Sequence, residues 1–94
     1  MPRYRQPHPD AALFGAALRR ARLARGWTIT KLAQRSGLNH QYLGVVEAGR
    51  NVPTLYVILE VCEVLGIDAG DLIREVAVAR KQPKDGAPPA PATT

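Results

Sequence analysis

Side chains that could hydrogen-bond nucleic-acid bases gather in one short stretch of the chain. The amide of Gln41 can pair bidentately with the N6 and N7 atoms of adenine, and His40 could donate to a base or a phosphate. Val45 could touch a thymine methyl group, and Gly44 could allow close approach to a groove floor, although a merely tolerated glycine would look the same. A solvent-exposed histidine without a role is an equally good interpretation of His40. The predicted base-reading residues are His40, Gln41, Gly44 and Val45.

Cations and small polar side chains flank this stretch and predict contacts with phosphate. Lys31 and Arg35 accompany the free N–H groups at the start of a predicted helix, which favour anions. Arg50 begins the loop that follows the stretch, and Tyr42 could pack its ring while its hydroxyl reaches outward. The predicted phosphate-contacting residues are Thr28, Lys31, Arg35, Asn39, Tyr42, Arg50 and Asn51.

Two short helical patterns position these side chains. Thr28 can cap the first pattern, residues 29–35, because its side-chain oxygen accepts from a backbone N–H that otherwise lacks a partner. Gly37 follows, where a left-handed backbone costs least, and Asn39 can cap the second pattern, residues 40–48. A helix, a short turn containing glycine and a second helix form the helix-turn-helix pattern, whose second helix enters the DNA major groove.

Three further helices are predicted around this pair, so the expected fold class is all-α with five helices. The first is expected at 10–25 with Asp10 as its N-cap, and the second at 55–65 with Thr54 as its N-cap. The third follows the N-cap Asp68 and extends to about Arg80. The chain is expected to comprise a flexible basic arm at 1–9, one domain at 10–80 and a disordered proline- and alanine-rich tail at 81–94.

The predicted helix at 55–65 is apolar on more than one side. The flank expected to cover the core comprises Leu55, Ile58, Leu59, Cys62 and Leu65. Valines form a second flank, and the last helix also presents apolar residues on several sides, for which a monomer has no obvious use. A two-fold dimer would bury this surplus. The predicted dimer interface comprises Val57, Val61, Val64, Leu72, Ile73 and Val76.

Taken together, many positions resemble the Cro/repressor-type (XRE) helix-turn-helix family. The resemblance covers about residues 14 to 73 and rests on Phe14, Gly15, Leu18, Ala21, Arg22, Gly26, Thr28, Lys31, Leu32, Ala33, Ser36, Gly37, Leu38, Tyr42, Leu43, Val46, Glu47, Gly49, Pro53, Thr54, Leu55, Leu59, Leu65, Gly66, Asp71 and Leu72. It implies a five-helix repressor-like fold and a DNA-binding transcriptional regulator.

The resemblance also implies a structural ion pair between Arg22 and Glu47, which would fix the angle between the first helix and the reading helix. The chain departs from the family pattern in two places. Ile29 stands where many members carry a glutamine that hydrogen-bonds a phosphate. Gly44 and Val45 stand where longer polar readers are common, so DNA shape could contribute to recognition.

Composition and charge limit the classes of function. The net charge is +5, and residues 1–50 hold nine basic and two acidic side chains, whereas residues 51–94 hold four basic and six acidic ones. The positive half therefore contains the helix-turn-helix, as expected if that end meets phosphate, although a basic face kept for solubility is the alternative. No stretch is apolar enough to span a membrane, and we expect a cytoplasmic protein.

The sequence offers no catalytic or metal-binding constellation. Cys62 is the single cysteine, which excludes an intramolecular disulfide, and a buried structural thiol is expected there. His8 and His40 lack a nucleophile, a carboxylate pair or further ligands at metal spacing. We therefore predict no enzyme activity, no cofactor and no metal.

The function predicted from these observations is sequence-specific binding of double-stranded DNA by a homodimeric transcriptional repressor on an inverted repeat. The alternative is an antitoxin-like or co-regulator module that binds another protein through its last two helices.

Overall fold

Five α-helices and no strands make up the part of the chain that the computed structural model describes, residues 8–82. They are α1 (Pro9–Ala24), α2 (Ile29–Ser36), α3 (His40–Glu47), α4 (Leu55–Leu65) and α5 (Ala69–Arg80). The prediction of an all-α fold with five helices is confirmed. The predicted arm and tail lie outside the described residues, apart from the residues next to α1 and α5. None of the described helices combines the length and apolar character needed to cross a membrane.

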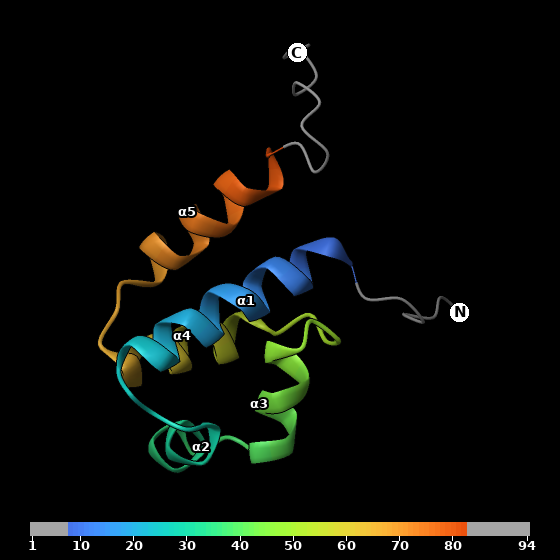
Figure 1. Ribbon diagram of the computed structural model, residues 1–94. Coiled ribbons are helices and arrows are strands. Elements are labelled where there is room, and N and C mark those ends of the chain that lie inside the picture. The colour runs from blue at the N-terminus through green and yellow to red at the C-terminus, as the bar shows by residue number, and fades with distance from the viewer. Residues whose placement is uncertain (1–7, 83–94) are drawn as a thin grey trace.

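Helix α1 lies at the centre of the arrangement, with α5 along one side, α4 behind it, and α2 and α3 below (Figure 1). The core between them is formed by apolar side chains from all five helices. Its largest fully buried members are Leu18, Leu32, Leu43, Val46, Val61, Cys62 and Leu65. Removing this apolar surface from water supplies the main favourable term for folding of so short a chain.

Each helix begins with a side chain that accepts a hydrogen bond from an otherwise unpaired backbone N–H. The predicted caps Thr28, Asn39, Thr54 and Asp68 accept from the N–H three residues later, at 2.9–3.2 Å. The prediction for α1 was wrong, because His8 is the cap and Asp10 lies in the first turn. Pro9 explains this start, since proline suits the first helical position, where no N–H partner is needed.

Helix α4 is rotated relative to its predicted orientation. Val57 and Val61 are buried in the core, whereas Leu55 and Leu59, predicted to be buried, are 69% and 49% exposed. Leu72 of α5 is also buried within the subunit. The assignment of Val57, Val61 and Leu72 to a dimer interface was therefore wrong, because their side chains are used inside one subunit. Of the other three predicted interface residues, Val64 and Val76 are partly buried and Ile73 is 44% exposed.

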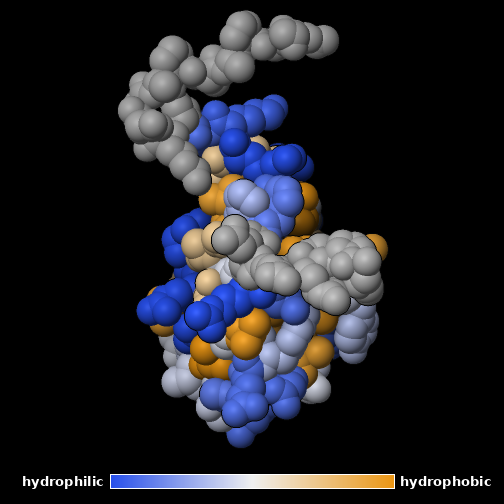
Figure 2. Space-filling view, turned by 90° about the vertical axis from the view of Figure 1, so that its right-hand side faces the viewer, coloured by the Kyte–Doolittle hydropathy of each residue, from blue (hydrophilic) through white to orange (hydrophobic). Residues whose placement is uncertain are grey.

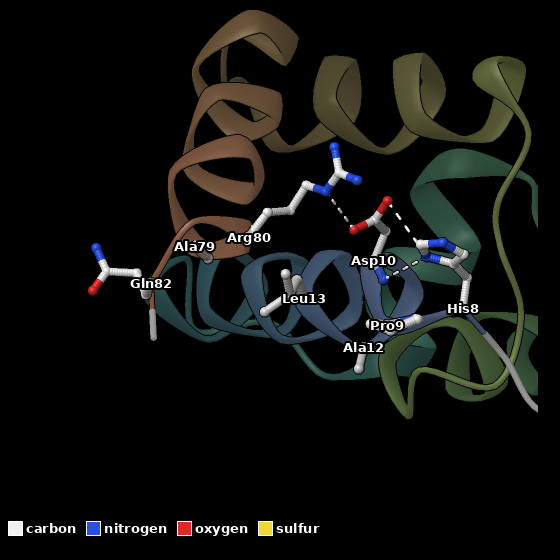
Figure 3. A pocket seen from close by; sticks show the side chains of 8 residues that line it. All are labelled: His8, Pro9, Asp10, Ala12, Leu13, Ala79, Arg80 and Gln82. Atoms are coloured by element: carbon white, nitrogen blue, oxygen red, sulfur yellow. Dashed lines mark hydrogen bonds and ion pairs between the residues drawn. The ribbon is translucent and has the colours of Figure 1, made fainter. Parts of the chain in front are cut away.

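Ion pairs connect α5 to α1 near both ends of the contact. Arg20 of α1 pairs with Glu75 of α5, and Arg80 Nε lies 3.0 Å from Asp10 Oδ1. Asp10 also lies 3.5 Å from His8 Nδ1, so the three side chains meet where α5 ends beside the start of α1 (Figure 3). These partly exposed pairs position α5 but add little stability individually.

The single thiol is part of the core. Cys62 is buried in α4, and this burial raises the pKa of its thiol, with the negative charge of Asp68 acting in the same direction. Because the thiolate is the reactive form, the raised pKa keeps Cys62 protonated and unreactive at neutral pH.

The backbones of α1 and α3 touch at Gly15. A Cβ at position 15 would lie 2.4 Å from the carbonyl oxygen of Val46 and 2.6 Å from that of Glu47. Gly49, with φ +78°, likewise packs against Ala12, where a Cβ would lie 2.7 Å from the Ala12 Cα. Only glycine allows α3 to approach α1 this closely.

Replacing Gly15 with alanine should destabilise the protein, because the new methyl group would overlap two backbone carbonyls that cannot move independently. Overpacking of this kind costs about 1–3 kcal/mol. Gly44→Ala is the matched control, since a Cβ there meets nothing within 4 Å and alanine favours helix by about 1 kcal/mol. Urea unfolding of both variants measures the difference. Equal free energies of unfolding for the two variants would contradict the proposed backbone contact.

Candidate nucleic-acid interface

The turn between α2 and α3 is closed by one glycine and one serine. Gly37 adopts φ +76°, as predicted for a residue that follows a helix. The Ser36 hydroxyl donates to the Leu32 carbonyl at 2.7 Å and accepts from the Leu38 N–H at 3.2 Å. This link was not predicted from the sequence. The buried hydroxyl links the end of α2 to the segment that enters α3, so it fixes the angle between the two helices.

Helix α3 has one face in the core and the opposite face in solvent. Leu43 and Val46 are completely buried beneath it. The predicted base-reading residues lie on the other face, where His40 and Gln41 are exposed, Val45 is 38% exposed and Gly44 is half-buried. A side chain at position 44 would point into open space, because no other part of the protein lies within 4 Å. The four residues thus form one accessible surface, named here the α3 outer face.

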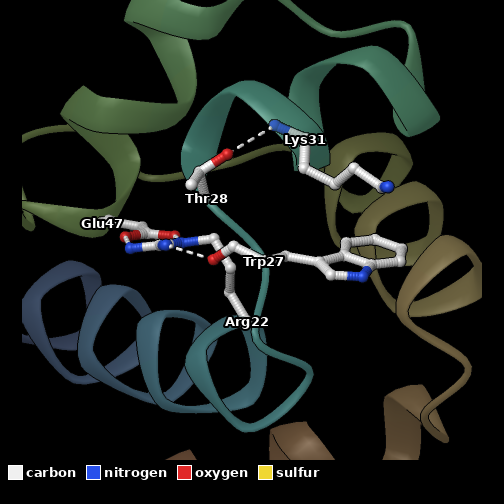
Figure 4. Close-up of polar contacts among 5 residues, drawn as sticks. All are labelled: Arg22, Trp27, Thr28, Lys31 and Glu47. Carbon is white, nitrogen blue, oxygen red and sulfur yellow. Dashed lines mark hydrogen bonds and ion pairs between the residues drawn. The ribbon is translucent and has the colours of Figure 1, made fainter.

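A buried ion pair holds α3 against α1 (Figure 4). Arg22 of α1 donates to both carboxylate oxygens of Glu47, from Nε to Oε2 at 2.7 Å and from Nη2 to Oε1 at 2.9 Å. Its remaining Nη1 donates to the Trp27 carbonyl at 2.7 Å. The pair implied by the family resemblance is therefore formed, and it also ties down the corner between α1 and α2.

The electrostatic surroundings favour the charged form of Arg22. Hydrogen bonding to Glu47 raises the pKa of the Arg22 guanidinium above its usual value, although burial acts in the opposite direction. Both side chains are almost inaccessible, with 7% and 4% of their surface exposed. Because the two side chains share two parallel hydrogen bonds, the pair constrains their relative orientation as well as their distance. It therefore determines the orientation of the α3 outer face.

The predicted phosphate-contacting residues divide into two groups. Thr28 and Asn39 use a side-chain oxygen to cap α2 and α3, and the half-buried Tyr42 donates its backbone N–H to Asn39 Oδ1 at 2.9 Å. Arg50 and Asn51 are exposed in the loop after α3, where the Arg50 N–H donates to the Val45 carbonyl at 3.0 Å. Thr28 and Asn39 thus lie at the starts of the two helices, Tyr42 lies in the first turn of α3, and Arg50 and Asn51 follow α3.

Lys31 and Arg35 form the second group, and they lie against Trp27. The Lys31 Nζ is 5.9 Å and the Arg35 Cζ 5.7 Å from the centroid of the indole ring, and the Arg25 Cζ is 4.7 Å from it. This group of cations around Trp27 was not predicted from the sequence. Lys31 and Arg35 are four residues apart on α2, so they share one face of that helix, which could have indicated a pair of neighbouring cations.

The side of the molecule on which α3 lies is mostly hydrophilic, with separate apolar areas between the polar ones (Figure 2). Within residues 8–82, no three His, Cys, Asp or Glu side chains lie close enough together to hold a metal ion. The accessible chemistry of the α3 side consists of hydrogen-bond donors and acceptors, cations and small apolar groups.

The comparisons with known proteins agree with this geometry. A family model described as a helix-turn-helix domain matches residues 13–76. The chain therefore belongs to the helix-turn-helix family, and its fold is that of the XRE-type regulators.

One relative is an uncharacterized HTH-type transcriptional regulator, y4dJ of Sinorhizobium fredii, which is 34% identical over 61 residues, or 65% of this chain and 79% of the relative. The clp gene regulator ClgR of Corynebacterium glutamicum superposes with a TM-score of 0.72 at 31% identity, covering 79% of each chain. The restriction-modification controller protein C.AhdI of Aeromonas hydrophila gives a TM-score of 0.67 at 37% identity, covering 69% of this chain and 98% of its own. These relatives are regulators, and the family is not enzymatic.

Replacing Glu47 with alanine should destabilise the protein by about 3–5 kcal/mol, because Arg22 would keep a buried charge without its partner. The double variant Arg22→Met with Glu47→Leu removes both charges and should recover part of this loss. Urea unfolding gives the three free energies. Glu75→Ala, which removes a partly exposed pair, is the control and should cost at most about 1 kcal/mol.

If the double variant were as unstable as Glu47→Ala, lost packing would explain the result better than an uncompensated charge.

Proposed function

We propose that this protein is a sequence-specific transcriptional regulator that binds double-stranded DNA as a homodimer and represses by occupying an inverted-repeat operator. The observation that carries the proposal is the α3 outer face, whose residues are accessible while the buried Arg22–Glu47 pair holds the helix in one orientation. A rigid helix with one accessible polar face is suited to the major groove.

The roles of the α3 side chains follow from their chemistry. Gln41 would recognise adenine through its amide, and His40 would donate to a base or a phosphate at the start of the helix. Val45 would contact a thymine methyl group. Gly44 would bring the helix backbone close to the base edges, since no neighbouring protein atom requires the absence of a side chain there.

Phosphate contacts would set the register of the helix on the duplex. Arg50 and Asn51 would contact the backbone from the loop after α3. Thr28, Asn39 and Tyr42 would do so from the helix starts, where unpaired N–H groups also favour an anion. The basic balance of residues 1–50 supports this placement, because it would attract DNA to the end of the chain that contains α3.

Two single variants should distinguish residues that read bases from residues that bind phosphate. The first duplex carries a site selected from random sequences, and the second carries a scrambled version of that site. Gln41→Ala should reduce the free energy of binding to the selected site by about 1–3 kcal/mol and change binding to the scrambled site little. Arg50→Ala should weaken binding to both duplexes alike. It should also reduce the magnitude of the slope of log K, where K is the binding constant, against log salt concentration by about 0.9. Fluorescence anisotropy of labelled DNA measures both. The absence of any complex at low ionic strength would contradict the proposed function.

The homodimer contact would use the exposed side of α4. Leu55, Tyr56 and Leu59 share one exposed side of this helix, and Val52 is exposed in the loop that leads to it. This α4 apolar face replaces the predicted interface valines that are buried. It follows α3 directly in sequence, so a two-fold contact here would hold two copies of α3 at a fixed spacing, as two half-sites about 34 Å apart require.

Introducing charge into the α4 apolar face should therefore dissociate the dimer. We expect Leu55→Glu with Leu59→Glu to sediment as a monomer and to bind the selected inverted repeat more weakly, because buried carboxylates without partners oppose association. Leu23→Glu, at a similarly exposed leucine on α1, should remain dimeric. Analytical ultracentrifugation distinguishes the states. A monomeric parent protein at all concentrations would instead favour a different protein partner for α4.

A further inference from the structure

Three cations surround the single tryptophan of the chain. Arg25, Lys31 and Arg35 lie with their charged groups 4.7, 5.9 and 5.7 Å from the centroid of the Trp27 ring. These four residues are named here the Trp27 cation cluster. They come from the end of α1, the loop after it and two successive turns of α2, so the corner between the helices brings them together.

Within residues 8–82, no carboxylate forms an ion pair with a cation of this cluster. Every ion pair found within residues 8–82 joins other side chains, namely His8–Asp10, Arg20–Glu75, Arg22–Glu47, Arg74–Asp71 and Arg80–Asp10. Arg25 donates one Nη1 hydrogen to the Leu65 carbonyl at 2.6 Å and keeps its other donors. The ring face attracts each cation modestly, but the repulsion among three like charges remains. An anionic partner would remove it.

The Trp27 ring and the Lys31 side chain point away from the Arg22–Glu47 pair (Figure 4). In Figure 4 the indole ring and the Lys31 ammonium point toward α4, whereas Glu47 and α3 lie on the opposite side of the Trp27 backbone. This orientation turns the Lys31 ammonium away from the side on which Glu47 and α3 lie.

We propose that the Trp27 cation cluster is a docking site for an acidic segment of a protein partner. Guanidinium groups bind carboxylates bidentately, and Lys31 adds a point charge that tolerates different geometries. The ring and the Leu65 carbonyl hold Arg25 in place, so less side-chain freedom is lost on binding. Several cations around one ring suit successive carboxylates of a glutamate- or aspartate-rich segment. The regulator would then hold DNA on α3 and a protein on the α2 corner.

Trp27 reports on this site directly, because it is the only tryptophan. The experiment titrates the full chain with an oligo-glutamate peptide and follows tryptophan fluorescence. We expect a saturable change, and Lys31→Gln with Arg35→Gln should weaken the apparent affinity roughly tenfold or more, since charge-assisted hydrogen bonds are lost. The matched controls Arg19→Gln and Arg50→Gln remove exposed cations elsewhere and should leave peptide affinity within about twofold.

Two outcomes would overturn the proposal. One is the absence of a saturable change, or an equal loss in the Arg19→Gln control, which would indicate general charge attraction. The other concerns the double variant Lys31→Gln with Arg35→Gln. If it weakens binding to duplex DNA as much as Arg50→Gln does and leaves peptide binding intact, the cluster is a contact for the DNA backbone. Unchanged thermal unfolding of each variant shows that the fold is retained. DNA binding by the parent protein is measured separately. A protein that fails to bind DNA could therefore still bind the peptide, and the two proposals can fail independently.

Discussion

A buried guanidinium and a buried carboxylate depend on each other in this protein. Taken separately, the side chains of Arg22 and Glu47 would each be costly inside the domain. Together they satisfy each other, and the third donor of Arg22 reaches the Trp27 carbonyl. One side chain therefore connects α1, the start of α2 and the end of α3. The close backbone contact at Gly15 completes this arrangement, because it removes the space in which α3 could tilt.

Local features of the fold were predictable because they depend on neighbouring residues only. Thr28, Asn39, Thr54 and Asp68 each cap the helix that was predicted for them, and α4 begins and ends at the predicted residues. Gly37 also occupies its expected left-handed position. Each of these assignments rests on an interaction that spans a few residues, which the order of amino acids states directly.

The features that sequence reasoning missed depend on the arrangement of whole helices. Helix α4 is apolar nearly all round, so its periodicity does not determine which flank meets α2 and α5, and Leu55 and Val61 were assigned to the wrong sides. The contact of Gly15 with α3 required the position of α3. The group of cations at Trp27 likewise required the corner between α1 and α2, since Arg25 and Arg35 belong to different segments.

The residues of α3 that pack into the core differ from those that face solvent, and this has a consequence for protein engineering. Leu43 and Val46 carry the packing of this helix, whereas positions 40, 41, 44 and 45 contribute no fully buried side chain. These four positions can be randomised together in a combinatorial library without altering the residues that dock the helix. If α3 reads DNA as proposed, such a library would be a starting point for changing the preferred DNA sequence, and position 44 has space for at least a Cβ, since nothing lies within 4 Å of it.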